Sequence, residues 1–182
     1  MPILELSRKI KRPYSQTHRN IKILEKKGLI TLNTIGHTNL CIYNYKKDII
    51  TTSYIESLRT KEFLNKNKKI ELLINKITSE FKIPTYTLII FGSYVKGTET
   101  KTSDVDIAII TDEQNISEAE RIEKYISNIS TIRIHIIEFT YNDFSKMLVS
   151  KEEINVGKEM IKNHIIITGY ENFYKTMEQT GW

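Results

Sequence analysis

Apolar residues are arranged along the chain in two different patterns, helical spacing and short continuous runs, and these patterns predict its secondary structure. Between Ile70 and Phe81 they are spaced by three or four positions, which predicts an amphipathic helix that ends before Pro84. Continuous apolar runs at 88–91 and 107–110 predict buried strands, and Ile132–Phe139 is predicted to be the third strand. Further helices are predicted from a capping box at Ser117–Glu120 to about Ile129, and over 140–149, 150–163 and 170–178, while His164–Thr168 fits either a short strand or a frayed end.

The first 47 residues show a different order of elements. Apolar residues have helical spacing over 3–10, and Lys11–Pro13 breaks this helix into a turn. A second helix is predicted over Ser15–Lys27, with its first residue as the N-cap and Gly28 as a left-handed stop. Two short strands on either side of a Thr34–His37 turn then predict a β-hairpin.

Residues 48–65 form a polar, charged connector that contains neither Pro nor Gly. Scattered apolar residues within it indicate a helix, so we expect a helical linker and not a flexible one. The chain then divides into a small domain at 1–47, this linker, and a larger domain at 66–182. The mixture of strands and helices places it in the α+β class.

The overall composition is that of a globular protein in a reducing compartment. The 182 residues are 40% hydrophobic and 27% charged, and Cys41 is the single cysteine, which excludes an internal disulfide. No stretch approaches the roughly 18 apolar residues of a membrane helix, and the N-terminus lacks the apolar core of a signal peptide. We therefore expect a cytoplasmic protein that does not enter a membrane.

Charge is distributed very unevenly along the chain. Residues 1–47 carry ten Lys or Arg and two acids, a formal +8, whereas the remainder carries seventeen and twenty, a formal −3. A small segment that holds the whole positive excess is the usual footprint of phosphate-backbone binding. The polar side chains that the second helix offers to a DNA groove are Gln16, His18, Arg19 and Lys22.

The order helix, turn, helix and hairpin over residues 3–45 resembles the winged helix-turn-helix of microbial transcription regulators. The segment Leu-Glu-Lys-Lys-Gly-Leu-Ile is similar to the end of their recognition helix. This resemblance implies binding of double-stranded DNA, usually as a homodimer. One departure is that the chain begins almost at the second helix of such a domain, so the apolar residues Ile3, Leu6 and Ile10 need another cover. The other interpretation is a basic two-helix adapter that packs on the larger domain.

A second pattern carries candidate chemistry. Gly92 and Ser93 follow the first buried strand, and ten residues later Asp104 and Asp106 open the next one. Residues two apart on a strand point to the same face, and two like charges there repel unless a cation lies between them. A glycine allows close approach of a ligand to the backbone, and a serine offers a hydroxyl and an amide to a phosphate.

This spacing resembles the signature of the nucleotidyltransferase superfamily typified by DNA polymerase beta, and in particular its minimal members. The resemblance covers about residues 66–145 and implies a short mixed sheet flanked by helices. It implies that ATP or another nucleoside triphosphate binds at Gly92, Ser93, Lys96 and Ser103, and that Asp104 and Asp106 hold Mg²⁺. Some minimal members act as antitoxins that adenylylate a toxin partner.

The third strand departs from this family pattern. Where the family places a third carboxylate, this chain has His135, and Glu138 is expected to face the other way. Imidazole is a poor ligand for Mg²⁺, but His135 could act as a general base near neutral pH. It could equally be an ordinary strand histidine.

Two classes of function remain open at this point. The first is an enzyme, a DNA-binding nucleotidyltransferase that modifies a hydroxyl of a protein or nucleic acid, with Asp104, Asp106 and His135 as the catalytic residues. The second is a catalytically impaired transcription regulator that uses the same domain to sense nucleotide or to dimerise. The absent third carboxylate favours the regulator, and the complete Gly-Ser and Asp-x-Asp pattern favours the enzyme.

Overall fold

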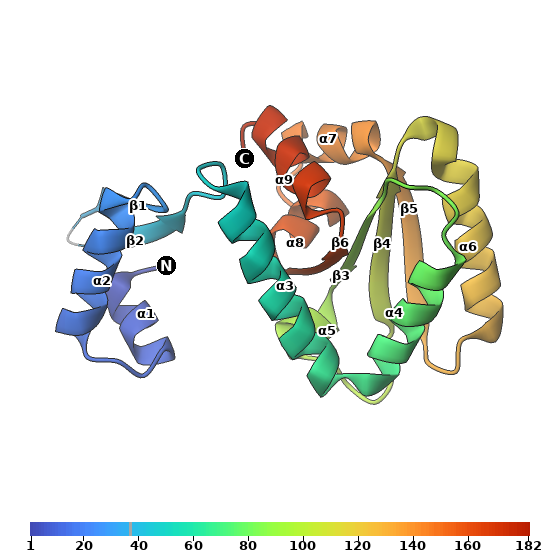
Figure 1. The fold of residues 1–182 in the computed structure, drawn as a ribbon, viewed down its shortest axis with the longest axis horizontal. Coiled ribbons are helices and arrows are strands. Elements are labelled where there is room, and N and C mark those ends of the chain that lie inside the picture. Colours follow the sequence, from blue (N-terminus) through green and yellow to red (C-terminus); the bar gives the residue numbers. More distant parts are fainter. Residues whose placement is uncertain (37) are drawn as a thin grey trace. The chain divides into compact units, whose positions relative to one another are not determined.

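The computed structural model describes residues 1–36 and 38–182. The chain forms two compact units, Met1–Thr52 and Ser53–Trp182. None of the helices among the described residues is long and apolar enough to cross a membrane. Figure 1 shows the elements of both units.

The first unit consists of two helices joined by a turn and followed by a β-hairpin (Figure 1). Its elements are α1 (Ile3–Lys9), α2 (Tyr14–Lys26), β1 (Ile30–Ile35) and β2 (Thr38–Tyr43). The two strands pair antiparallel, with Ile30 opposite Tyr43. The chain's first residues extend this pairing, because Pro2 bridges to Leu40 and the backbone groups of Met1 and Cys41 exchange two hydrogen bonds.

The predicted N-cap of α2 is wrong by two residues. Pro13 and not Ser15 is the N-cap, and its carbonyl accepts hydrogen bonds from both the amide and the hydroxyl of Thr17. Proline is well suited to this place because the first amides of a helix have no intrahelical acceptor. The end is confirmed, since Gly28 adopts φ +75° directly after the C-cap. The predicted hairpin turn includes His37, which lies outside the described residues.

The second unit is built on a four-stranded mixed sheet. Its strands are β3 (Thr87–Phe91), β4 (Val105–Thr111), β5 (Ile134–Thr140) and β6 (His164–Thr168), in the spatial order β5-β4-β3-β6. β4 and β5 are parallel, and the other two pairs are antiparallel. The helices are α3 (Ile49–Lys66, which starts in the first unit), α4 (Lys68–Glu80), α5 (Ser93–Lys96), α6 (Ile116–Ile129), α7 (Tyr141–Val149), α8 (Val156–Lys162) and α9 (Tyr170–Gln179), with a 3₁₀ turn at Glu113–Asn115.

Both faces of this sheet are covered, which explains why its central strands are continuously apolar. Alternate residues such as Leu88, Ile107 and Ile136 point toward α4 and α6 and form one core with Ile74 and Ile122. The opposite face packs against α7, α8 and α9 (Figure 1). The central strands therefore hold the loops at their ends in fixed positions.

Two predicted helix limits in this unit are wrong. The 3₁₀ turn at Glu113–Asn115 runs directly into α6, whose N-cap is Asn115, so the supposed capping box at Ser117 lies inside the helix. The helix predicted over 150–163 begins only at Val156, because Asn155 caps it by accepting the amide of Lys158. His164–Thr168 is a strand, since the antiparallel neighbour β3 gives it a ladder that sequence reasoning could not supply.

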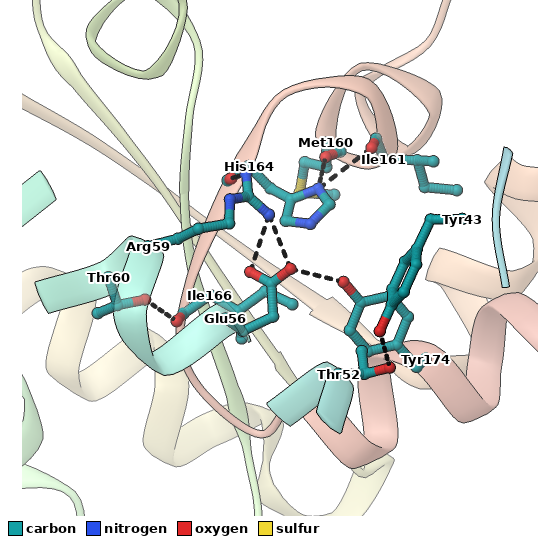
Figure 2. A network of polar contacts seen from close by, with 10 residues as sticks. All are labelled: Tyr43, Thr52, Glu56, Arg59, Thr60, Met160, Ile161, His164, Ile166 and Tyr174. Atoms are coloured by element: carbon teal, nitrogen blue, oxygen red, sulfur yellow. Dashed lines mark hydrogen bonds and ion pairs between the residues drawn. The ribbon is translucent and has the colours of Figure 1, made fainter. Parts of the chain in front are cut away.

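Helix α3 closes the free edge of β6 with polar side chains (Figure 2). Arg59 donates to the carbonyl of His164 at 2.8 Å, and the Thr60 hydroxyl donates to the carbonyl of Ile166 at 2.6 Å. Arg59 is held by the buried Glu56 carboxylate, which also accepts the Tyr174 hydroxyl at 2.8 Å. An edge strand normally exposes such carbonyls to pairing with another chain, and this helix removes that opportunity.

Candidate functional site

A cavity of about 480 Å³ opens at the end of the sheet where β3 stops and β4 and β5 start. Parallel and antiparallel neighbours bring the ends of these strands together at one edge. The residues that line the cavity come from β3, α5, β4, β5, α8 and the segments that precede α5 and α8, and they are Phe91, Gly92, Ser93, Lys96, Asp106, His135, Ile137, Ile154, Asn155, Val156 and Glu159.

Gly92 lets the backbone turn directly beside a carboxylate. Its φ of +75° is a conformation that side-chain-bearing residues rarely adopt. A Cβ added there would lie only 2.0 Å from Oδ2 of Asp106. The turn between Gly92 and Ser93 therefore brings main-chain atoms into contact with Asp106 in a way that no other residue type allows.

Asp106 and His135 lie side by side on parallel strands. The β4–β5 register pairs them directly, and His135 Nδ1 is 3.4 Å from Asp106 Oδ1. The Asp106 side chain is 27% exposed and that of His135 is 60% exposed, so both reach the cavity and water. Glu138 lies among α6 residues on the other face, as expected, where burial raises the pKa of its carboxyl and the nearby Glu123 and Glu120 add to that rise.

Two residues of the sequence pattern lie differently from Asp106. Asp104 precedes β4 and is exposed, so the expectation that both carboxylates sit on one strand is only half right. The Ser103 hydroxyl accepts the amide of Thr100 at 2.9 Å and closes the turn that leads into β4. Neither residue is among those that line the cavity. Ser103 therefore has a local role in shaping the turn.

Lys96 crosses the cavity mouth to a residue that sequence reasoning missed. Its ammonium forms an ion pair with Glu159 of α8, 63 positions away in the sequence. Both side chains are about one third exposed. A glutamate within a predicted amphipathic helix gives no signal of this role, because only the packing of α8 beside β3 brings it to the site.

The donor set suits Mg²⁺ that arrives with a phosphate ligand. Among the described residues no group of three or more His, Cys, Asp or Glu side chains could hold a metal by itself. Mg²⁺ commonly takes one or two carboxylates and completes its octahedron with water and phosphate oxygens. Asp106, with Asp104 two residues before it and the Ser93 hydroxyl nearby in the cavity wall, provides that kind of partial oxygen site.

The polar residues predicted to face DNA are in the first unit. Gln16, Arg19 and Lys22 are exposed on α2, and Lys22 pairs with Glu25 at 2.8 Å. His18 is half-buried and lies beside the ring of Tyr14, with 5.9 Å between ring centroids, so its side chain is less accessible to DNA than expected. Of the apolar flank that was expected to need a cover, Ile3 is buried, Leu6 is half-buried and Ile10 is 47% exposed.

Comparisons with known proteins concern mainly the second unit. A family model described as the nucleotidyltransferase domain matches residues 70–163. The chain is 31% identical over 101 residues to a candidate protein adenylyltransferase of Methanocaldococcus jannaschii, MJ1379, and this covers 53% of the chain and 93% of that protein. It is 27% identical over 111 residues to a second one from the same organism, MJ1305, which covers 59% of the chain and 71% of that protein.

A solved structure named "Crystal structure of the toxin-antitoxin with AMP-PNP" aligns with 62% of this chain and 84% of that chain. The TM-score is 0.37 and the sequence identity is 19%.

Proposed function

The chain belongs to the nucleotidyltransferase domain family, and on this premise we propose that it transfers a nucleotidyl group from a magnesium nucleoside triphosphate, ATP first, to a hydroxyl group of a protein. The observation that carries the proposal is the contact between Gly92 and Asp106. It creates a place where phosphate oxygens can approach main-chain amides and a carboxylate together, which is the arrangement that a metal-bound triphosphate requires.

The cavity residues divide the work as follows. The turn at Gly92 and Ser93 binds phosphate oxygens, and Lys96 supplies a positive charge when it leaves Glu159. Asp106 would hold Mg²⁺, with the exposed Asp104 two residues before it as a second carboxylate, and the bound metal would neutralise charge on the triphosphate. His135, beside Asp106, accepts the proton of the acceptor hydroxyl as that oxygen attacks the α-phosphorus and pyrophosphate leaves.

A protein acceptor is favoured over a nucleic acid by the names of the archaeal relatives, which are candidate protein adenylyltransferases. A toxin partner, as in the antitoxins that the sequence pattern resembles, is one such acceptor. An antitoxin role is supported by the motif at Gly92–Ser93 and Asp104–Asp106, which resembles that of the minimal nucleotidyltransferases.

Incubation with α-labelled ATP and Mg²⁺ tests this function. The parent protein should bind Mg-ATP, and its melting temperature should rise with the logarithm of ligand concentration over Kd. Asp106→Asn should lose both the shift and the transfer of label to acceptor proteins, while Asp112→Asn, outside the cavity, serves as the matched control. If the melting temperature of the parent does not change at millimolar Mg-ATP, the proposed nucleotide site is wrong.

A second function, binding of duplex DNA by the first unit, is supported by its formal +8 charge and its helix-turn-helix and hairpin. Replacing Arg19 and Lys22 together by Ala should weaken DNA binding at least tenfold, about 1.4 kcal/mol. Binding by the parent should fall steeply as salt rises. Gel shifts in which the double variant binds like the parent would contradict this role.

In the alternative interpretation, the protein is a regulator that binds DNA and nucleotide but does not transfer a nucleotidyl group. This interpretation predicts a protein that binds Mg-ATP and DNA and transfers no label to any acceptor. The His135–Asp106 pair, which offers a proton acceptor inside the cavity, favours the enzyme.

A further inference from the structure

The segment 150–155 between α7 and α8 has no helix or strand, yet hydrogen bonds fix it in place. Asn155 Nδ2 donates to the carbonyl of Met147 at 2.8 Å, and its Oδ1 accepts the amide of Lys158. The Lys158 ammonium donates to the carbonyls of Ser150, at 2.7 Å, and Glu152. Such side-chain bonds replace the missing backbone ladder and hold one loop conformation.

This fixed loop presents an isoleucine to water at the mouth of the cavity. Ile154 is 84% exposed and Val156 is 40% exposed. Both line the same cavity as Asp106, and Ile137 continues their apolar surface inward along β5. We call Ile137, Ile154 and Val156 the apolar lip. An exposed aliphatic side chain is common by itself, but one that a fixed loop places at a reaction site is suited to contact a bound molecule.

The charges beside the apolar lip indicate which class of molecule it suits. Glu152 and Glu153 immediately precede Ile154 and are exposed, and in the described part of the chain neither forms an ion pair. Within residues 150–155, all of which the structure describes, Lys151 is the one exposed cation, and the Lys158 ammonium is bound to backbone carbonyls. Two carboxylates repel a phosphate backbone and attract basic side chains, so a polypeptide fits this surface better than a nucleic acid.

We propose that the apolar lip is the docking surface for the acceptor, a polypeptide segment that carries an apolar side chain and a basic residue beside its reactive hydroxyl. This inference rests on the proposed nucleotidyl transfer and specifies its second substrate. The apolar side chain packs on Ile154 and Val156 while the hydroxyl enters the cavity toward Asp106 and His135. Contact at the lip thus selects the acceptor, and the nucleotide binds independently at the Gly92–Ser93 turn.

The reaction on a docked segment balances without another reagent. The acceptor oxygen forms a bond to the α-phosphorus, and the bond from that phosphorus to the β-phosphate oxygen breaks. Pyrophosphate leaves with the electron pair, and the hydroxyl proton passes to His135 and then to water. The product is a polypeptide that carries a nucleoside monophosphate ester.

Two sets of synthetic peptides test the docking surface on the full-length protein with α-labelled ATP and Mg²⁺. One set places Ser, Thr or Tyr between Leu and Lys residues, and the other places them between Ser and Glu residues. A DNA and an RNA oligonucleotide with free 3′-hydroxyls form a third arm. The parent should label the Leu and Lys peptides at least tenfold faster than the others at equal concentration.

Ile154→Ser is the diagnostic variant, because an exposed side chain can be replaced with little effect on folding. It should raise KM for the labelled peptides at least fivefold while leaving the Kd for Mg-ATP unchanged. Leu72→Ser is the matched control, since Leu72 is 71% exposed on α4 and does not line this cavity. That control should leave both constants unchanged.

Other results overturn the proposal. Equal labelling of both peptide sets, preferential labelling of an oligonucleotide, an unchanged KM in Ile154→Ser, or no labelling of any peptide each removes the docking surface. Binding of Mg-ATP by the parent, measured separately by calorimetry, then distinguishes the two failures. If the parent binds Mg-ATP and labels both peptide sets equally, only the docking inference is lost, whereas preferential labelling of an oligonucleotide or absence of binding removes the proposed transfer to a protein as well.

Discussion

At the scale of single residues, the site depends on the missing side chain of Gly92 as well as on the side chains that line the cavity. Gly92 contributes no side chain, and this alone allows Asp106 to lie against the turn. Lys96 and Glu159 show the complementary case, in which a cation is already satisfied by the protein and a phosphate has to compete for it.

The role of Gly92 can be separated from simple backbone strain. Gly92→Ala should weaken Mg-ATP binding at least tenfold, because its Cβ would lie 2.0 Å from Asp106 Oδ2. Gly97→Ala is a close control, since Gly97 also has a positive φ, +69°, but has no atom within 4 Å of its added Cβ. Both variants should lose on the order of 1 kcal/mol of stability through the backbone conformation. Equal ATP affinity in the two variants, measured by calorimetry, would refute the argument.

Glu159 should restrain Lys96 in the absence of nucleotide. Glu159→Gln removes the competing carboxylate, so the Kd for Mg-ATP should fall by roughly three- to tenfold, whereas Lys96→Met should raise it. Glu152→Gln, which removes an exposed charge outside the ion pair, should change it little. Weaker ATP binding by Glu159→Gln would mean that this side chain positions Lys96 and does not compete for it.

At the scale of elements, the edge strand β6 is stabilised by contacts with the helices α3 and α9. α3 binds its outward carbonyls through Arg59 and Thr60, and the ring of His164 lies within the packed face at 5.0 Å from that of Phe173. His164 Nδ1 is 2.7 Å from the carbonyl of Met160, while Nε2 is buried without a hydrogen-bond partner among the described residues. The neutral imidazole is therefore the form that fits.

This arrangement predicts a loss of stability in mild acid. Burial is the main cause that lowers the pKa of His164, and the nearby Arg59 lowers it further, while Glu56 and the hydrogen bonds to Met160 and Ile161 oppose the shift. Because the folded pKa lies below that of the unfolded chain, about 6.5, the unfolded state binds the proton first as pH falls. His164 therefore contributes full stability above that pH and loses it progressively below.

Urea denaturation at pH 7.5 and pH 5.5 checks this expectation. The midpoint of the parent should be lower at pH 5.5, and His164→Gln should show a smaller difference between the two pH values. His135→Gln is the control, because His135 is 60% exposed and forms no such buried contact. A pH dependence that is the same in the parent and in His164→Gln would rule out this histidine as the source.

At the scale of the whole molecule, α3 offers a surface that suits assembly. Tyr54 and Leu58 follow each other at i and i+4 and are 65% and 50% exposed. A helix face with this spacing of large apolar side chains is typical of helix pairing. We therefore expect a homodimer through α3, which also agrees with the two-fold binding that helix-turn-helix proteins commonly use.

Light scattering at tens of micromolar measures this directly. The parent should have the mass of two chains, and Tyr54→Lys should shift the mass toward that of one chain, because it places a charge in this apolar surface of α3. Lys61→Ala, which removes an exposed side chain from the same helix, should leave the dimer intact. A monomeric parent at this concentration would contradict the expected dimer through α3.

The sequence by itself determined several elements of this protein and the place of its candidate site. The pattern of apolar residues located α4 and the central strands, because spacing by three or four positions indicates an amphipathic helix and a short apolar run that ends at a glycine indicates a buried strand. The pattern from Gly92 to Asp106 located the cavity because strand, tight turn and strand are local in the chain. Such features need no knowledge of distant contacts.

Only the tertiary structure decided what depends on residues far apart in the sequence. His164–Thr168 became a strand because β3 provides a partner, and Glu159 joined the site because α8 packs beside that strand. Asp104 and Ser103 match the sequence pattern, yet both precede β4 and Ser103 closes the turn before it, so of these residues only Asp106 lines the cavity. Ile154 reaches the mouth because hydrogen bonds from Asn155 and Lys158 fix a loop that sequence periodicity assigns to a helix. Periodicity reports which side chains are buried along one element, whereas a site is a meeting of several elements, and their packing alone sets it.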